Sequence, residues 1–238
     1  MKILALDSSG LVASVAVVEN DTLLAEYTVN YKKTHSQTLL PMLDEISNMT
    51  ELDLSTIDAI AVAGGPGSFT GLRIGSATAK GLGLALEKPL ISIPTTAAIA
   101  YNIWDTDKFV CPIMDARRNQ VYTGVYCYTD HRLDTVWEQD TMSIEALAEG
   151  LNCLDHEVIF LGDGVAVYRE KLEALLTIPF SFAPAHVNRQ RAAAVGALAE
   201  VYYKEGKIQT AEEHEPEYLR KSQAERERAE RESVKHAD

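Results

Sequence analysis

The fold is decided by a strand-rich stretch near the start of the chain, residues 2–29, KILALDSSGLVASVAVVENDTLLAEYTV. Lys2–Asp7 is a nearly continuous apolar run and Val12–Val18 is rich in β-branched residues, two patterns that favour strands. Thr22–Val29 follows after Glu19-Asn20-Asp21, a turn of the kind that joins hairpin strands. The stretch therefore predicts an antiparallel meander of three strands.

Helices alternate with strands after this meander, and the pattern then starts again. It predicts helices at 35–49, 69–86 and 95–103 and strands at 57–63 and 90–93. Parallel strands added beside a hairpin are typical of an RNase H-like unit. Beyond Asp105 the pattern predicts strands at 110–114, 121–128, 133–137 and 157–161 and helices at 143–150, 165–176 and 188–205. We therefore predict an α/β protein with two related lobes, residues 1–106 and 107–221, followed by a charged tail at 222–238.

Composition and charge limit the class of function. The chain has 238 residues and a formal net charge of −13, so it should repel nucleic acid, whose phosphates are bound mainly by Lys and Arg. No apolar run approaches the roughly 20 residues that span a bilayer. The three cysteines form no C-x-x-C pair, which favours reduced thiols. We expect a cytoplasmic protein that binds neither a membrane nor, by itself, nucleic acid.

Two loops at strand ends are candidates for phosphate binding. In the first, Asp7, Ser8 and Ser9 precede Gly10, where a carboxylate could hold a metal and the following amides could cradle a phosphate. The second is GGPGSFTG at 64–71, with Gly65, Gly67 and Ser68 before a predicted helix. This loop is not a Walker A, G-x-G-x-x-G or G-x-S-x-G motif. A plain tight turn remains the alternative for both loops.

The helix after the second loop contains a strip of small residues at every fourth position: Gly71, Gly75, Ala79 and Gly83. Each glycine inside a helix costs about 1 kcal/mol relative to alanine, so a close backbone neighbour is expected as compensation. That neighbour is either the sheet of the same lobe or another chain. We predict a subunit interface formed with helix 35–49, with these residues at its centre: Leu39, Leu40, Leu43, Gly71, Leu72, Gly75, Ala79 and Gly83.

Other ionisable residues give weaker indications. The six histidines include no H-x-x-x-H or H-E-x-x-H pair, so the sequence predicts no metal site. Asp115-Ala116-Arg117-Arg118 lies between two predicted strands and could bind an acidic group, although a salt-bridged hairpin turn is the alternative.

Five segments in this order resemble the bacterial TsaB family, also called YeaZ: ILALDSS, HSQTLLPML, AVAGGPGSFTGLRIG, MDARRNQVY and EPEYLR. The resemblance extends to about Lys221. It implies the fold of the actin-like, acetate and sugar kinase superfamily, made of two RNase H-like lobes. It also implies a non-catalytic role in making threonylcarbamoyladenosine in the tRNA anticodon loop. The implied partners are the catalytic paralogue TsaD and a TsaE-like ATPase, with homodimers when TsaD is absent.

The resemblance also bears on particular residues. It places the family interface on the first two helices, here 35–49 and 69–86. The metal-binding H-x-x-x-H of TsaD corresponds to Thr95 and Ile99 here, which implies no metal. The phosphate loop of the second lobe corresponds to Gly162-Asp163-Gly164, where Asp163 would repel a phosphate, so no nucleotide cofactor is expected. The enzymatic alternatives are an ATP-dependent kinase or transferase that uses Asp7, and a glycoprotease-like peptidase that uses Ser68.

Overall fold

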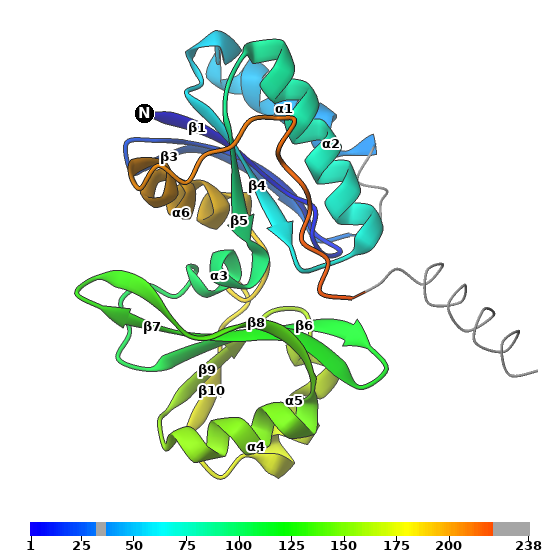
Figure 1. Ribbon diagram of the computed structural model, residues 1–238, viewed down its shortest axis with the longest axis vertical. Helices are drawn as coiled ribbons and strands as arrows, with labels where there is room; N and C mark the ends of the chain where they lie inside the picture. The colour runs from blue at the N-terminus through cyan, green and yellow to red at the C-terminus, as the bar shows by residue number, and fades with distance from the viewer. Residues whose placement is uncertain (32–36, 221–238) are drawn as a thin grey trace, which may run out of the picture.

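The chain forms two lobes, each built around a five-stranded sheet (Figure 1). The computed structural model describes residues 1–31 and 37–220. The start of the predicted helix 35–49 and the predicted charged tail therefore lie outside the described residues. The strand order is β3-β2-β1-β4-β5 in one sheet and β10-β9-β6-β7-β8 in the other.

The first lobe contains β1 (Lys2–Asp7), β2 (Ala13–Glu19), β3 (Thr22–Val29), α1 (Leu39–Thr50), the 3-10 turn η2 (Leu54–Thr56), β4 (Ala59–Gly65), α2 (Phe69–Leu86), β5 (Leu90–Pro94) and α3 (Thr95–Ala100). The second contains β6 (Phe109–Arg117), β7 (Gln120–Thr129), β8 (Arg132–Ser143), α4 (Ile144–Leu154), β9 (Val158–Leu161), α5 (Val165–Leu175) and β10 (Phe180–Phe182). Helix α6 (Ala192–Lys204) follows. In both sheets three antiparallel strands are extended by two parallel ones. The predicted fold class, with a duplicated lobe, is confirmed.

Strand β1 is apolar along its length because both of its faces are covered. Leu4 and Leu6 belong to the cluster that includes α1 residues such as Leu39. Ile3 and Ala5 belong to the cluster formed with α3 and α6. Alternate residues of a strand point to opposite faces, so the middle of a strand that is covered on both sides is apolar on both, as Ile3–Leu6 are here. Helices α1 and α2 therefore cover one face of the first sheet, and α3 and α6 the other.

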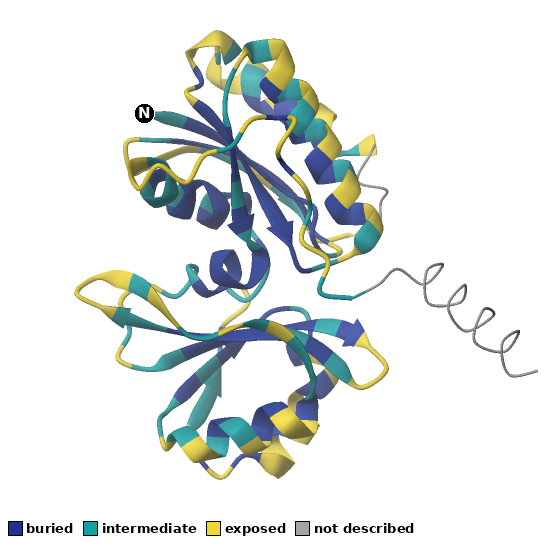
Figure 2. Ribbon diagram, viewed as in Figure 1, coloured by how far each residue is buried: buried dark blue, intermediate teal, exposed yellow. Residues whose placement is uncertain are grey.

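Helix α3 lies between the two lobes. All six of its residues are buried, and it contacts β4 of the first lobe and β6 of the second (Figure 2). The hydroxyl of Thr96 lies 2.8 Å from the Tyr126 hydroxyl and donates to Gln139 Oε1 at 2.8 Å. Buried hydrogen bonds of this kind fix the relative position of the packed elements.

The second lobe is shorter than predicted, because the chain returns to the first lobe after β10. Helix α6 packs on β1 and β2, with Val18 so close to Gly196 that a Cβ there would lie 2.7 Å from the valine methyl. The segment after α6 then pairs with β5, where Leu90 and Gln209 exchange backbone hydrogen bonds of 2.8 and 2.9 Å. The predicted range 107–221 for the second lobe therefore has to be corrected.

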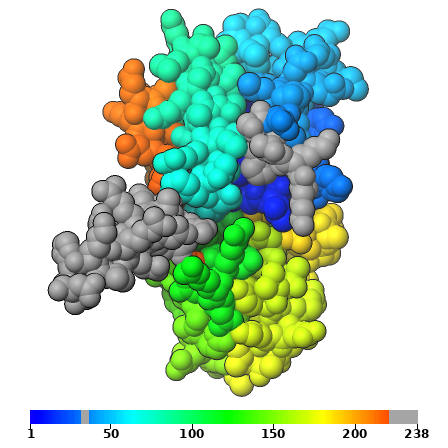
Figure 3. All heavy atoms as spheres, turned by 90° about the vertical axis from the view of Figure 1, so that its right-hand side faces the viewer, coloured from blue at the N-terminus to red at the C-terminus, as the bar shows by residue number. Residues whose placement is uncertain are grey.

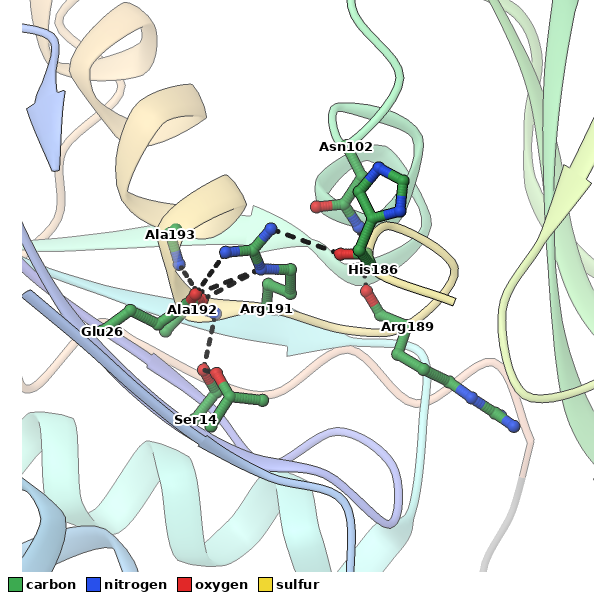
Figure 4. A network of polar contacts seen from close by, with 9 residues as sticks. Ser14, Glu26, Asn102, His186, Arg189, Arg191, Ala192 and Ala193 are labelled. Carbon is green, nitrogen blue, oxygen red and sulfur yellow. Dashed lines mark hydrogen bonds and ion pairs between the residues drawn. The ribbon is translucent and has the colours of Figure 1, made fainter. Parts of the chain in front are cut away.

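The return of the chain is fastened by a polar cluster at the start of α6 (Figure 4). The Arg191 side chain donates from Nε to Glu26 Oε2 on β3 at 3.1 Å. Glu26 Oε1 also accepts from the Ala193 amide at 3.1 Å, and the Ser14 hydroxyl accepts from the Ala192 amide at 2.9 Å. The first amides of a helix have no partners within the helix. Strands β2 and β3 supply those partners here and so anchor α6 on the first sheet.

The remaining differences from the expected elements are local. Helix α1 begins at Leu39, so Pro41 lies in its first turn, where its missing N–H breaks no hydrogen bond of the helix. The edge strand β8 extends beyond the predicted range 133–137. Its residues are mixed and mostly polar, so the sequence pattern does not show its full length. Strand β10 has only three residues and was not expected. No helix of the described part of the chain is long and apolar enough to cross a membrane.

Candidate functional site: a self-packed loop cluster and an exposed helix face

The two predicted phosphate loops of the first lobe lie against each other. The Ser68 amide donates to the Ser9 carbonyl at 2.7 Å, and the Ser8 hydroxyl donates to the Gly71 carbonyl at 2.8 Å. A Cβ on Gly67 would lie 2.3 Å from the Ser9 carbonyl oxygen, well inside van der Waals contact. Gly67 of the second loop is therefore required by the backbone of the first loop.

The side chains that the enzymatic alternatives invoke also have structural tasks. Asp7 is buried, and its Oδ1 accepts from the amide of Ser9 at 2.9 Å and from the Ser9 hydroxyl at 2.7 Å. The Ser68 hydroxyl caps α2 by accepting from the Gly71 amide at 3.3 Å. Both side chains thus stabilise the turns in which they lie.

A later part of the chain covers the glycine-rich loop. We call residues 205–220, which follow α6, the C-terminal strap. The Glu217 amide donates to the Gly64 carbonyl at 2.7 Å, and a Cβ on Gly65 would lie 2.2 Å from the Glu217 carbonyl oxygen. The ring of Tyr218 packs on Phe69, with centroids 4.6 Å apart. Gly65, with a φ of 127°, therefore fits a strap that arrives from far along the sequence.

The strap also joins the two lobes. Gln139 on β8 donates to the Glu217 carboxylate at 2.7 Å, and the Arg220 guanidinium donates to the Ala116 carbonyl at the end of β6. No local signal in the sequence indicates these contacts, because their partners are separated by 78 and 104 residues. The strap contains the segment EPEYLR, whose place in the fold only the structure gives.

The predicted phosphate loop of the second lobe is packed in the same way. A Cβ on Gly162 would lie 2.2 Å from the Ile113 carbonyl oxygen, and the Gly164 amide donates to that carbonyl at 3.0 Å. Asp163 Oδ1 accepts from the Asp115 amide at 3.2 Å. Burial raises the pKa of Asp163, against the lowering effects of that hydrogen bond and of Arg189. Here too the glycines are explained by the chain's own backbone.

The two residues that the resemblance matches to the TsaD histidines are both buried. Thr95 begins α3, and its hydroxyl accepts from the Gly65 amide at 3.2 Å. Ile99 lies in the core cluster between the sheet and α6. Thr95 therefore positions the glycine-rich loop, and Ile99 contributes to packing.

The predicted interface strip faces the protein's own sheet, which corrects the expectation that another chain covers it. A Cβ on Gly71 would lie 2.0 Å from the Ser8 carbonyl oxygen, and one on Gly75 would lie 2.5 Å from the Ser8 hydroxyl. A Cβ on Gly83 would lie 2.6 Å from a methyl of Leu90. Three helix glycines thus have partners within the first lobe. Other predicted interface residues are also buried in the chain: Leu39, Leu43, Leu72 and Ala79.

A second strip of small residues lies on the opposite side of α2. Ala77, Gly81 and Ala85 are also spaced by four residues, and all three are exposed. Leu84 beside them is 61% exposed, and Leu40 on the neighbouring α1 is 53% exposed. We call these five residues the outer helix face. In Figure 2 exposed segments alternate with buried ones along α2, and Figure 3 shows α2 along the surface.

Gly81 sets the outer strip apart from the inner one. A Cβ on Gly81 would have no neighbouring atom within 4 Å, so nothing in the described chain requires a glycine there. Periodicity alone cannot decide which of two strips on one helix faces inward. Of the eight residues predicted for the interface, Leu40 remains at the surface.

Comparison with known proteins agrees with this architecture. A family model described as "TsaD: tRNA N6-adenosine threonylcarbamoyltransferase" matches residues 22–228. The chain is 32% identical over 225 residues to "tRNA threonylcarbamoyladenosine biosynthesis protein TsaB" of Bacillus subtilis (strain 168), which covers 94% of this chain and 96% of that protein. It is 30% identical over 232 residues to the protein of the same name from Escherichia coli (strain K12), with coverages of 94% and 96%.

Among solved structures, YeaZ from Pseudomonas aeruginosa superimposes with a TM-score of 0.80 at 27% identity, covering 92% of this chain and 99% of that one. Two RNase H-like lobes of the same topology, joined by α3, define an α/β protein of the actin-like superfamily that includes the acetate and sugar kinases. The chain belongs to the TsaB (YeaZ) family.

Proposed function

We propose that this protein is a non-catalytic subunit in the synthesis of threonylcarbamoyladenosine in tRNA. In this proposal it docks on a TsaD-related catalytic chain through the outer helix face. The names of its relatives support the pathway. The match of its own domain to the TsaD family model supports a partner of the same fold. The observation that carries the docking surface is the exposed Gly81.

An exposed glycine in the middle of a helix destabilises the free chain by about 1 kcal/mol relative to alanine. Gly83 and Gly75, on the other side of α2, are compensated by close packing on the same lobe, whereas Gly81 meets open space. A smooth strip at 77, 81 and 85 lets the backbone of a second helix approach closely. Leu84 and Leu40 supply apolar area that docking would remove from water. The outer helix face therefore has the composition of a helix-to-helix contact.

The non-catalytic role is supported by the packing of the loops that bind phosphate in related folds. The glycine-rich loop of the first lobe packs against Ser9 on one side and against the strap residue Glu217 on the other. The loop around Gly162 holds the Ile113 carbonyl. We infer that these loops connect the lobes of a rigid subunit. A TsaE-like ATPase is proposed to join the complex, and in the absence of TsaD two copies are proposed to pair through the outer helix face.

The experiment measures the affinity of the protein for the TsaD of the same organism by calorimetry, with three variants. Gly81→Leu should weaken binding by at least about 30-fold, the factor that corresponds to about 2 kcal/mol. Gly81→Ala is the matched control, because it changes the same position by one methyl group. Gly75→Leu should instead unfold the chain, since its Cβ would already meet the Ser8 hydroxyl at 2.5 Å.

Melting curves separate the two effects. If folded Gly81→Leu binds TsaD as tightly as the wild type does, the outer helix face is not the docking surface. If the wild type neither binds TsaD nor raises its transferase activity, the proposed function itself is wrong.

A further inference from the structure

The turn between β6 and β7 has an unusual backbone. Arg117, Arg118 and Asn119 are three consecutive residues in the left-handed region, with φ of 62°, 55° and 60°. The turn between β2 and β3 in the first lobe uses Asn20 and Asp21, two residue types that adopt the left-handed region readily. The β7–β8 turn uses Asp130 and His131. Only the β6–β7 turn among these three hairpins places arginine at such positions.

Arginine is a poor choice for this backbone on conformational grounds. The left-handed conformation costs roughly 1–2 kcal/mol for a residue whose side chain cannot compensate by a local hydrogen bond. Glycine or asparagine at 117 and 118 would form the same turn at lower cost. The two arginines are therefore explained by what their side chains do, since the turn does not require them.

The turn is also held firmly in place. Asp115 Oδ1 accepts from the Arg117 amide at 2.8 Å, and Arg220 of the strap donates to the Ala116 carbonyl. At the other end the Asn119 side chain donates to Glu145 at 2.7 Å. These contacts hold in place the backbone from which the two arginine side chains extend.

The two guanidinium groups face solvent without a partner. Arg117 and Arg118 are exposed, and within the described part of the chain neither guanidinium forms an ion pair or a hydrogen bond. By contrast, Arg132, beside the β7–β8 turn, pairs with Glu205 at 2.9 Å. Among the described residues, therefore, no salt bridge of these two arginines supports the turn. Two unpaired cations project from a chain of net charge −13.

The β6–β7 turn lies on the same side of the molecule as α2. Figure 3 shows both on one face, α2 in cyan above and the turn in bright green below. A protein docked on the outer helix face would extend over this region if it has a second lobe of similar size. The turn is thus placed to touch a partner that α2 has already engaged.

We propose that Arg117 and Arg118 bind carboxylates of an acidic segment of the partner that docks on the outer helix face. Guanidinium groups match carboxylates in a bidentate geometry, and such charge-assisted bonds add specificity. An RNA backbone is the less suitable ligand, because its many phosphates need several Lys and Arg and would be repelled by a chain of net charge −13. The inference rests on the proposed function for the identity of the partner.

The test compares the affinity for TsaD of the same organism in low and high salt. The double variant Arg117→Asn/Arg118→Asn removes both charges and keeps a residue type that tolerates the left-handed backbone. Its affinity should fall about 10-fold in low salt, and the difference should shrink in about 0.5 M salt, where charges are screened beyond about 4 Å. Arg132→Asn, the matched control, should leave the affinity unchanged.

The outcomes separate this inference from the proposed function. If the double variant binds as the wild type does at both salt concentrations while Gly81→Leu fails to bind, the arginine contact is refuted and the docking surface stands. If neither variant changes the affinity, both are refuted. If the double variant keeps its affinity for TsaD while the complex loses affinity for tRNA, the ligand is phosphate and the carboxylate assignment is wrong.

Discussion

Two glycines of α2 should respond in opposite ways to the same substitution. In Gly81→Ala the new methyl group meets no atom within 4 Å, so the helix gains about 1 kcal/mol of stability from alanine's higher propensity. In Gly71→Ala the new Cβ would lie 2.0 Å from the Ser8 carbonyl oxygen, a backbone atom that cannot turn aside. Overpacking at such a site costs about 3 kcal/mol, which leaves a net loss of about 2 kcal/mol after the propensity gain.

Thermal denaturation followed by circular dichroism measures both effects. For a chain of this size 1 kcal/mol corresponds to about 2–4 °C in Tm, so Gly81→Ala should melt about 2–4 °C higher and Gly71→Ala about 4–8 °C lower than the wild type. Melts at two protein concentrations control for self-association, which would make Tm depend on concentration. If Gly71→Ala is as stable as the wild type, or if Gly81→Ala melts lower at both concentrations, the assignment of inner and outer strips is wrong.

Two further predictions concern the polar groups that hold the first lobe together. Glu26→Gln removes the charge that Arg191 pairs with and weakens the cap of α6, so urea denaturation should show that the free energy of unfolding falls by about 2 kcal/mol. The control variant Glu45→Gln, on the exposed side of α1, should show no loss. Equal stability of the two variants would refute the role of Glu26 in anchoring α6. His214 is buried, and burial lowers its pKa from the ordinary 6.5. Because the unfolded chain binds this proton more readily, Tm should fall as the pH is lowered from about 7.5 to about 5.5. His214→Gln should flatten that slope, and an unchanged slope would show that another group is responsible.

The sequence alone predicted the elements that repeat a local pattern. The meander at 2–29 alternates strand and turn residues, and the helix at 69–86 follows directly on a glycine-rich loop, so the strands and the helix agree with the predicted ranges within one or two residues. The edge strands β8 and β10 were harder, because one is polar and the other has three residues. Local patterns are reliable where one element is long and its burial is uniform.

Local sequence patterns do not predict how the elements are placed relative to each other. The apolar positions of α6 predict a helix, but they do not say that it crosses back to the sheet of the first lobe. Likewise, Gly65 and Gly67 suggested a ligand loop, whereas the strap residue Glu217 and the Ser9 carbonyl occupy the space that those glycines leave. A glycine signals that something approaches closely, and only the fold identifies what approaches.

The helix strip illustrates the same limit for the candidate site. Two sets of small residues on α2 have the same spacing, one at 71, 75, 79 and 83 and the other at 77, 81 and 85. The first set contains more glycines, which is why the sequence favours it as the interface. The set with more glycines faces the sheet, because α2 approaches the sheet most closely. The less obvious set is left at the surface, where it forms the outer helix face.

Photo-cross-linking of the assembled complex tests the docking surface most directly. A benzoylphenylalanine in place of Leu84, a residue of the outer helix face that is 61% exposed, is compared with one in place of Val167, a residue of α5 in the second lobe that is 58% exposed. With TsaD of the same organism present, irradiation should join the two chains from position 84 and not from position 167. Cross-links from position 167 alone, with both variants folded, would contradict the central claim that the partner docks on α1 and α2.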